Sequence, residues 1–162
     1  MKNEQLKPRE RPITVGEIAP DFVLMDQNRQ EWRLSEALRK GDVVLGFFPM
    51  AFTGVCGTEM KCITAGMGEW QKNGAEVVGI SGDSFATLKA WADQEGLKQT
   101  LLADMHRSVC RAYGFYWAEL NLASRGTVVI GKSADGKGRV KWVQAREPKN
   151  AMKWDEVLAA MS

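Results

Sequence analysis

Cys56 is the residue whose position in the sequence points most directly to covalent chemistry. The apolar run over residues 43–48 ends at Pro49, and a helix is predicted over residues 56–72, so that Cys56 falls in the first turn of this helix. A thiol attacks as its thiolate. The first turn of a helix offers unpaired amides and a partial positive charge, both of which favour an anion. We therefore expect Cys56 to be an acidic, nucleophilic cysteine.

Two residues before Cys56 are of types that could assist such a thiolate. Thr53 precedes the cysteine by three positions and can bring its hydroxyl toward the sulfur or its substrate, although a threonine here could also simply cap the helix. Pro49 ends the apolar run and removes a backbone amide. We expect Pro49 to shape the pocket and to keep water out of it.

The other two cysteines, Cys62 and Cys110, raise the question of how an oxidised Cys56 would be reduced. Cys62 follows Cys56 by six positions on the predicted helix, which corresponds to about 9 Å along the axis and roughly 240° of rotation. A disulfide needs Cα atoms within about 7 Å, so this pair could form one only if the helix start unwinds. Three alternatives stay open: Cys62 resolves, Cys110 resolves, or an external thiol does so. A position in the core is the default expectation for Cys110.

The elements that must position these residues alternate between strand-like and helix-like runs. The continuous apolar runs at residues 43–48 and 76–81 are typical of central strands covered on both faces. Further strands are predicted over residues 21–25, 31–34, 101–102, 126–130 and 140–143, and helices over residues 36–39 (capped by Ser35), 56–72, 84–94 (capped by Asp83 or Ser84), 105–113 and 148–161. This order predicts an α/β sandwich of thioredoxin type, with a central mixed sheet flanked by helices.

Composition and charge exclude several classes of protein. The chain has 162 residues with 22 basic and 20 acidic side chains, a balance that argues against nucleic-acid binding. No apolar stretch approaches the roughly 18 residues of a membrane span. Three cysteines are too few and odd in number for a disulfide scaffold. Residues 1–7 are polar and lack the apolar core of a signal peptide. We expect a cytoplasmic protein with a flexible extension over residues 1–12 and one domain over residues 13–162.

The chain resembles the peroxiredoxins in several segments. Pro49, Thr53 and Cys56 reproduce the spacing of the signature of that family, proline, three residues, threonine, two residues, cysteine. Residues 18–22 match the opening of the family, and residues 124–130 match a downstream segment that contains its pocket arginine, here Arg125. The run over residues 47–56 is most similar to the alkyl hydroperoxide reductase E subgroup, and Glu59 also fits that subgroup.

The resemblance implies a thioredoxin fold of peroxiredoxin type and assigns roles at the reacting atoms. Cys56 would be the peroxidatic cysteine, which becomes a sulfenic acid. Thr53 would hydrogen-bond the peroxide, and Arg125 would keep the thiolate ionised and stabilise charge on the leaving oxygen. The alternative interpretation of Arg125 is a surface cation.

The resemblance also assigns residues around these. Amides near Val55 would line the site, Pro49 would shield the sulfur, and Glu59 would belong to a supporting polar network, near an arginine. Alternatively, Glu59 could be a first-turn acid that complements the helix dipole. The family pairs its subunits through the edge that holds Phe52, which predicts a homodimer with Phe52 either in the contact or in the pocket wall.

The implied function is that of a thiol-dependent peroxidase that reduces hydrogen peroxide and organic hydroperoxides in antioxidant defence, recycled by an external thiol or redoxin. Neither a cofactor nor a metal is expected, because the single histidine, His106, cannot assemble a site with the cysteines. Two alternatives share the fold. A thiol–disulfide oxidoreductase would need Cys-x-x-Cys, where the chain has Glu59, and a non-catalytic redox-binding module would not need the pocket residues.

Overall fold

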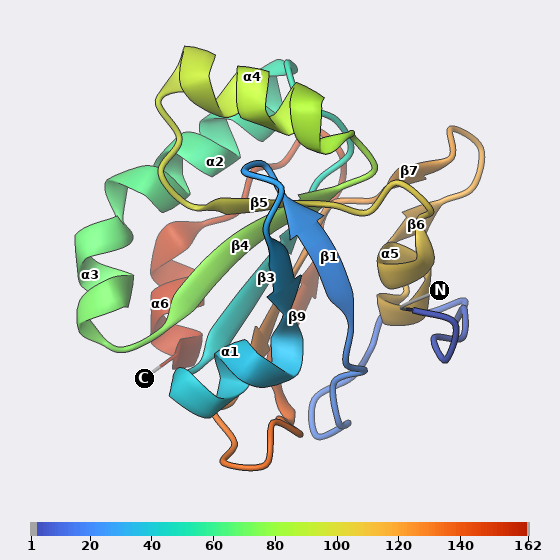
Figure 1. The fold of residues 1–162 in the computed structure, drawn as a ribbon, viewed down its shortest axis with the longest axis vertical. Helices are drawn as coiled ribbons and strands as arrows, with labels where there is room; N and C mark the ends of the chain where they lie inside the picture. Colours follow the sequence, from blue (N-terminus) through green and yellow to red (C-terminus); the bar gives the residue numbers. More distant parts are fainter. Residues whose placement is uncertain (1–2, 162) are drawn as a thin grey trace.

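A seven-stranded mixed sheet forms the middle layer of the protein, whose computed structural model describes residues 3–161 (Figure 1). The strand order is β2-β1-β5-β4-β3-β8-β9. The strands are β1 (Val23–Asp26), β2 (Glu31–Arg33), β3 (Val43–Phe47), β4 (Glu76–Ser81), β5 (Thr100–Ala103), β8 (Gly126–Ile130) and β9 (Val140–Ala145). β3, β4 and β5 run parallel, whereas β1, β8 and β9 pair antiparallel with their neighbours. The predicted α/β fold with a mixed sheet is confirmed.

Helices cover both faces of the sheet. One face packs against α1 (Leu34–Lys40) and α5 (Ser108–Tyr113), and the other against α2 (Gly54–Ala65), α3 (Met67–Lys72), α4 (Phe85–Glu95) and α6 (Trp154–Met161). The sheet thus has a first hydrophobic core under α1 and α5 and a second under the other four helices. Side chains alternate along β3, so that Leu45 and Phe47 lie in the first core and Val44 lies in the second. The apolar run therefore behaves as a strand buried on both sides.

The predicted helix over residues 56–72 is in fact two helices, α2 and α3, that meet at Gly66. The Trp154 ring of α6 packs against this glycine so closely that a Cβ there would lie 2.6 Å from the indole Nε1. The contact is between segments distant in sequence, so helical periodicity alone could not predict it.

Several other boundaries also differ from the sequence-based prediction. Ser35 lies inside α1 and does not cap it; its amide donates to the carboxylate of Asp21. α5 begins at Ser108, because Arg107 before it has a φ of 57°. α6 begins at Trp154 and not at residue 148. Ser84 does cap α4, by accepting from the amide of Thr87. A small hairpin of β6 (Tyr116–Trp117) and β7 (Leu122–Ala123) was not predicted.

Residues 3–12 lie against the domain. The Asn3 side chain donates to the Val23 carbonyl at 2.8 Å, and the Arg9 amide donates to the Arg111 carbonyl at 3.0 Å. Leu6 packs against the first core. The division at residue 12 and the flexibility of this segment stay predictions, and residues 1–2 of the predicted extension lie outside the described residues.

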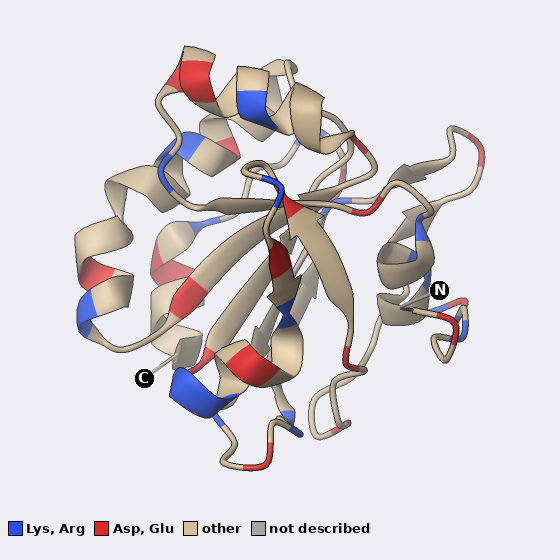
Figure 2. Ribbon diagram, viewed as in Figure 1, with Lys and Arg blue, Asp and Glu red and all other residues tan. Residues whose placement is uncertain are grey.

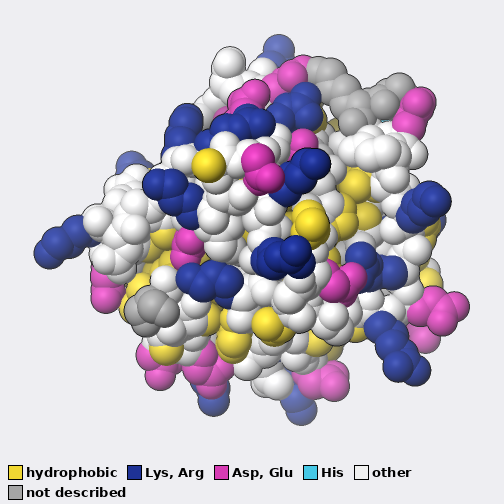
Figure 3. All heavy atoms as spheres, turned by 90° about the horizontal axis from the view of Figure 1, so that it is seen from below, with side chains coloured by type: hydrophobic (Ala, Val, Ile, Leu, Met, Phe, Trp, Pro, Cys, Tyr) yellow, Lys and Arg dark blue, Asp and Glu magenta, His cyan; other side chains and the backbone are white. Residues whose placement is uncertain are grey.

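Basic and acidic residues are interspersed along the chain (Figure 2). The face in Figure 3 likewise carries Lys and Arg side chains beside Asp and Glu, with small apolar areas between them. Within residues 3–161, none of the helices has the length and apolarity that a bilayer crossing requires.

Candidate active site

A strained loop joins β3 to α2 and delivers Cys56 to the start of the helix. Phe52 in this loop has a φ of 62°, a left-handed conformation unusual for a bulky residue. The loop is held from outside by Asp83, whose carboxylate accepts the Ala51 amide at 2.9 Å and the Ser81 hydroxyl at 2.6 Å. Strain that persists because neighbouring groups fix it is common at functional sites.

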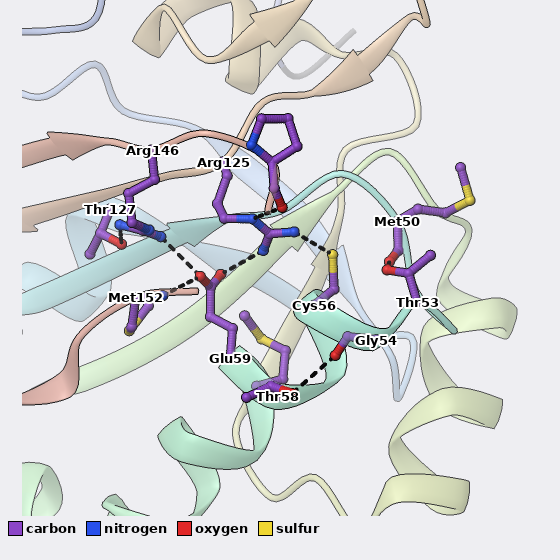
Figure 4. Close-up of polar contacts among 12 residues, drawn as sticks. Met50, Thr53, Gly54, Cys56, Thr58, Glu59, Arg125, Thr127, Arg146 and Met152 are labelled. Atoms are coloured by element: carbon purple, nitrogen blue, oxygen red, sulfur yellow. Dashed lines mark hydrogen bonds and ion pairs between the residues drawn. The ribbon is translucent and has the colours of Figure 1, made fainter. Parts of the chain in front are cut away.

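The guanidinium of Arg125 lies directly against the sulfur of Cys56 (Figure 4). Its Nη2 donates to Sγ at 3.1 Å, and the two residues are 2% and 1% exposed. Sheet register explains the meeting of residues so distant in sequence: Gly126 of β8 pairs with Phe47 of β3, which places Arg125 beside the loop that leads to Cys56. Arg125 is therefore a buried residue and not a surface cation.

The remaining nitrogens of Arg125 are also engaged. Nε donates to the Pro148 carbonyl at 3.0 Å, and Nη1 lies 3.4 Å from Oε1 of Glu59, an ion pair that lacks hydrogen-bond geometry. Glu59 follows Cys56 by three positions on α2, so both side chains lie on one side of the helix. Contacts on three sides fix the direction in which the guanidinium faces the sulfur.

Glu59 is fully buried between two arginines. Its Oε2 accepts from Nη2 of Arg146 at 3.0 Å and from the Met152 amide at 2.8 Å. Burial lowers the pKa of Arg146, and the Glu59 carboxylate opposes that shift. Two guanidiniums share this one buried carboxylate, and the partly exposed Glu156 adds a second negative charge that acts on Arg146. Because a buried charge is costly unless it is paired, a thiolate on Cys56 would have its pairing cation in Arg125.

Arg146 and Asp83 are site residues that the sequence analysis missed. Arg146 follows β9 directly, in a segment with no motif, and it reaches Glu59 only because β9 pairs with β8. Asp83 is one of the two predicted caps of the following helix, but its carboxylate accepts the Ala51 amide and so holds the loop before Cys56. Ser84, the other predicted cap, accepts the amide of Thr87 and caps α4. Local sequence could not distinguish these roles.

Thr53 occupies the N-cap position of α2 without using its side chain as a cap. Its hydroxyl donates to the Met50 carbonyl at 2.7 Å. A hydroxyl carries one donor and two acceptor lone pairs, so with its proton engaged Thr53 presents an acceptor. Val55 follows in the first helical turn, where backbone amides lack intrahelical partners. The loop and helix start thus offer both an acceptor and donors beside Cys56.

The three cysteines are free thiols in very different surroundings. Cys62 is exposed on α2, and the helix is continuous between it and Cys56. Cys110 is buried in α5, where burial, together with the nearby Asp104 carboxylate, raises the pKa of its thiol far above the ordinary value. Cys110 therefore has the expected core position.

Across the part of the chain that the structure describes, no group of three or more His, Cys, Asp or Glu side chains is arranged to hold a metal ion. The position three residues after Cys56, where a Cys-x-x-Cys motif would place its second thiol, holds the buried Glu59. The site is thus one sulfur within a network of fixed charges.

Comparisons with known proteins agree on one family. Residues 15–142 match the model of the AhpC/TSA family. The chain is 34% identical over 155 residues to alkyl hydroperoxide reductase E of Mycobacterium tuberculosis, which covers 93% of this chain and 99% of that protein. It is 33% identical over 132 residues to peroxiredoxin Bcp of Escherichia coli, covering 82% and 79% of the two chains.

Solved structures show the same likeness. The crystal structure of peroxidoxin BcpB from Mycobacterium tuberculosis has a TM-score of 0.80 at 29% identity, covering 92% of this chain and 96% of that one. The reduced 2-Cys peroxiredoxin of Plasmodium vivax has a TM-score of 0.81 at 26% identity, covering 92% and 94%.

Proposed function

The chain belongs to the AhpC/TSA family and is a peroxiredoxin, a thiol peroxidase, and we propose that Cys56 is the residue that reduces the peroxide. The observation that carries this assignment is the contact of 3.1 Å between Arg125 Nη2 and Cys56 Sγ, in a buried site where Arg125 and Arg146 both pair with Glu59. In the interior of a protein such fixed charges act with little screening. Cys62 is exposed, and burial together with the Asp104 carboxylate raises the pKa of the Cys110 thiol despite the nearby Arg107.

The proposed step is an attack of the Cys56 thiolate on the O–O bond of the peroxide. A bond forms between sulfur and the nearer oxygen while the O–O bond breaks. The electron pair leaves with the farther oxygen, which takes up a proton to become water or an alcohol. Cys56 is thereby oxidised to a sulfenic acid. Arg125, already aimed at this space, stabilises the negative charge that moves from sulfur to the leaving oxygen.

Thr53, Val55 and Pro49 complete the proposed substrate site. Because the Thr53 proton is engaged by the Met50 carbonyl, its oxygen would accept the O–H of the peroxide and orient it in line with the sulfur. The Val55 amide would donate to a peroxide oxygen. Pro49, half-buried before the loop, would shield the sulfur from bulk water.

Organic hydroperoxides are proposed as substrates beside hydrogen peroxide. Met50 and Phe52 are 41% and 50% exposed in the loop that precedes Cys56. Exposed apolar side chains at this place would bind the alkyl part of a hydroperoxide. The name of the mycobacterial relative, alkyl hydroperoxide reductase E, supports this class.

An external thiol or redoxin is the proposed reductant. Cys56 and Cys62 lie on one continuous helix, where a spacing of six residues corresponds to about 9 Å, beyond the reach of a disulfide. Resolution by Cys62 would require the first turns of α2 to unwind. Cys110 is buried in the core on the other face of the sheet. We propose a cycle in the cytoplasm in which neither cysteine resolves.

A homodimer is proposed through the edge that holds Phe52. The ring is half exposed, lies 6.4 Å from Trp91, and stands on a strained backbone. Phe52→Asp should weaken association measured by sedimentation, whereas Leu120→Asp, which alters an equally exposed residue in the β6–β7 hairpin, should not. Equal sedimentation of wild type and Phe52→Asp at all concentrations would argue against this interface.

Peroxide consumption by reduced protein tests the assignment of Cys56. Without added reductant, wild type should consume about one equivalent of hydrogen peroxide per chain, because one thiolate becomes one sulfenic acid. Cys62→Ser should consume the same amount and Cys56→Ser almost none. Consumption by Cys56→Ser at the wild-type rate would assign the chemistry to another residue.

A further inference from the structure

Gln144 of β9 joins the C-terminal helix α6 to the arginine cluster. Its Nε2 donates to Oε2 of Glu156 at 2.9 Å, and its Oε1 accepts from Nη1 of Arg146 at 3.2 Å. Glu156 lies in the first turn of α6, and both interactions are partly shielded from water. One amide therefore bridges a helix of the outer layer and a buried guanidinium.

The chemistry of the two neighbours fixes the orientation of this amide. Arg146 can only donate hydrogen bonds, and an ionised Glu156 can only accept them. Gln144 must turn its oxygen to the first and its nitrogen to the second. A flip would set donor against donor and acceptor against acceptor. The pairing thus holds Gln144 in one state, which in turn fixes one end of the Arg146 guanidinium.

Arg146 connects Gln144 to the residues that surround the sulfur. Its Nη1 donates to Gln144 and to the hydroxyl of Thr127, while Nη2 donates to Glu59. Glu59 is the carboxylate that lies 3.4 Å from Arg125 Nη1. In Figure 4 the dashed contacts run without a break from Thr127 and Arg146 through Glu59 and Arg125 to the sulfur.

The segment between Arg146 and α6 contacts the same cluster with its backbone. The Pro148 carbonyl accepts Arg125 Nε, and the Met152 amide donates to Glu59. Met152 and Val157 are buried in the second core, which anchors the end of this segment and α6. The position of α6 therefore affects Arg125 in two ways, through the side chains of Gln144, Arg146 and Glu59 and through the backbone of the segment that precedes the helix.

We propose that Gln144 and Glu156 are positioning residues, which use the docked α6 to set the direction of the Arg125 guanidinium. This inference rests on the proposed function, since it concerns the arginine that stabilises the leaving oxygen. Fixed donors act on a transition state only when they are held in place beforehand. The expected consequence is that peroxide reduction depends on two residues that do not contact the sulfur.

The test measures the rate of Cys56 oxidation by hydrogen peroxide, with rapid quenching and mass analysis. Gln144→Leu should slow this reaction by about tenfold, as a hydrogen bond to a charged group is worth at least that factor. Gln144→Glu alone should also be slow, because it places two carboxylates together. Combining Gln144→Glu with Glu156→Gln exchanges acceptor and donor and restores the pattern, so this double variant should come within about twofold of wild type.

Controls separate positioning from folding and from the proposed function. Gln71→Leu, the same change at an exposed glutamine of α3, should react as wild type does, and melting temperatures identify any variant that fails to fold. An unreactive wild type would overturn the function of Cys56 itself. A reactive wild type with an equally fast Gln144→Leu, or a double variant as slow as Gln144→Glu at unchanged melting temperature, would overturn the positioning role.

Discussion

Charge at the sulfur depends on a few residues, none of which is a histidine. The guanidiniums of Arg125 and Arg146 share the single carboxylate of Glu59, and Nη2 of Arg125 donates to Cys56. The proposed mechanism needs no base with a pKa near neutrality, because fixed cations and the helix start would stabilise a thiolate.

Arg125→Ala should reduce the rate of peroxide reduction on the order of 100-fold, which is typical for the loss of one preorganised donor to a transition-state anion. The rate of Arg125→Lys should lie between those of wild type and Arg125→Ala, because lysine keeps the charge but loses the forked guanidinium that reaches both Cys56 and Glu59. Rapid-mixing kinetics with hydrogen peroxide measure both. An Arg125→Ala enzyme as fast as wild type would remove the arginine from the mechanism.

Cys110 should stay unreactive across the accessible pH range. Burial raises the pKa of this thiol far above its ordinary value, so the thiolate fraction is negligible at neutral pH and remains so as pH rises toward 9. Iodoacetamide labelling of the folded protein, followed by peptide mapping, should modify the exposed Cys62 and spare Cys110. Labelling of Cys110 at the rate of Cys62 in folded protein would contradict this.

Sequence reasoning reached the residues that a motif or a helix period places near the sulfur. Pro49, Thr53, Cys56 and Glu59 are close in the chain, so local rules could relate them. Arg146 could not be found in this way, since its approach to Glu59 depends on the pairing of β9 with β8. Arg125 was assigned only through the family resemblance.

Among the elements, central strands were predictable and helix ends were not. β4 and β8 have the predicted bounds, because the length of an apolar run that is buried on both faces gives the length of the strand. A helix that ends at a tertiary contact has no such local signal for its end. The break between α2 and α3 lies at Gly66, against the ring of Trp154, and α6 begins just after Met152, whose amide donates to Glu59.

Gly66→Ala tests that contact. The new Cβ would lie 2.6 Å from the Trp154 indole, so the rigid ring or the helix must shift, at a cost of roughly 1–3 kcal/mol in the free energy of unfolding. Gly68→Ala, in α3, meets no atom within 4 Å and should stabilise by about 0.5–1 kcal/mol. Urea denaturation measures both. Equal effects of the two substitutions would mean that Trp154 does not pack there.

At the scale of the whole molecule, the fold brings three distant parts of the chain to one point. The parallel centre of the sheet delivers the loop before α2, the antiparallel strand β8 delivers Arg125 opposite Phe47, and the segment before α6 closes the cluster from the C-terminal side. The alternation of strands and helices was enough to predict the layers. It could not predict which loops would meet, because that depends on strand order and register.

The most direct test of the central claim is the mass of intact, reduced protein after one equivalent of hydrogen peroxide without reductant, followed by peptide mapping. We predict the gain of one oxygen atom, located on Cys56 and absent from Cys56→Ser. Unchanged mass, or the same oxygen found on Cys62 with Cys56 still reduced, would contradict the account.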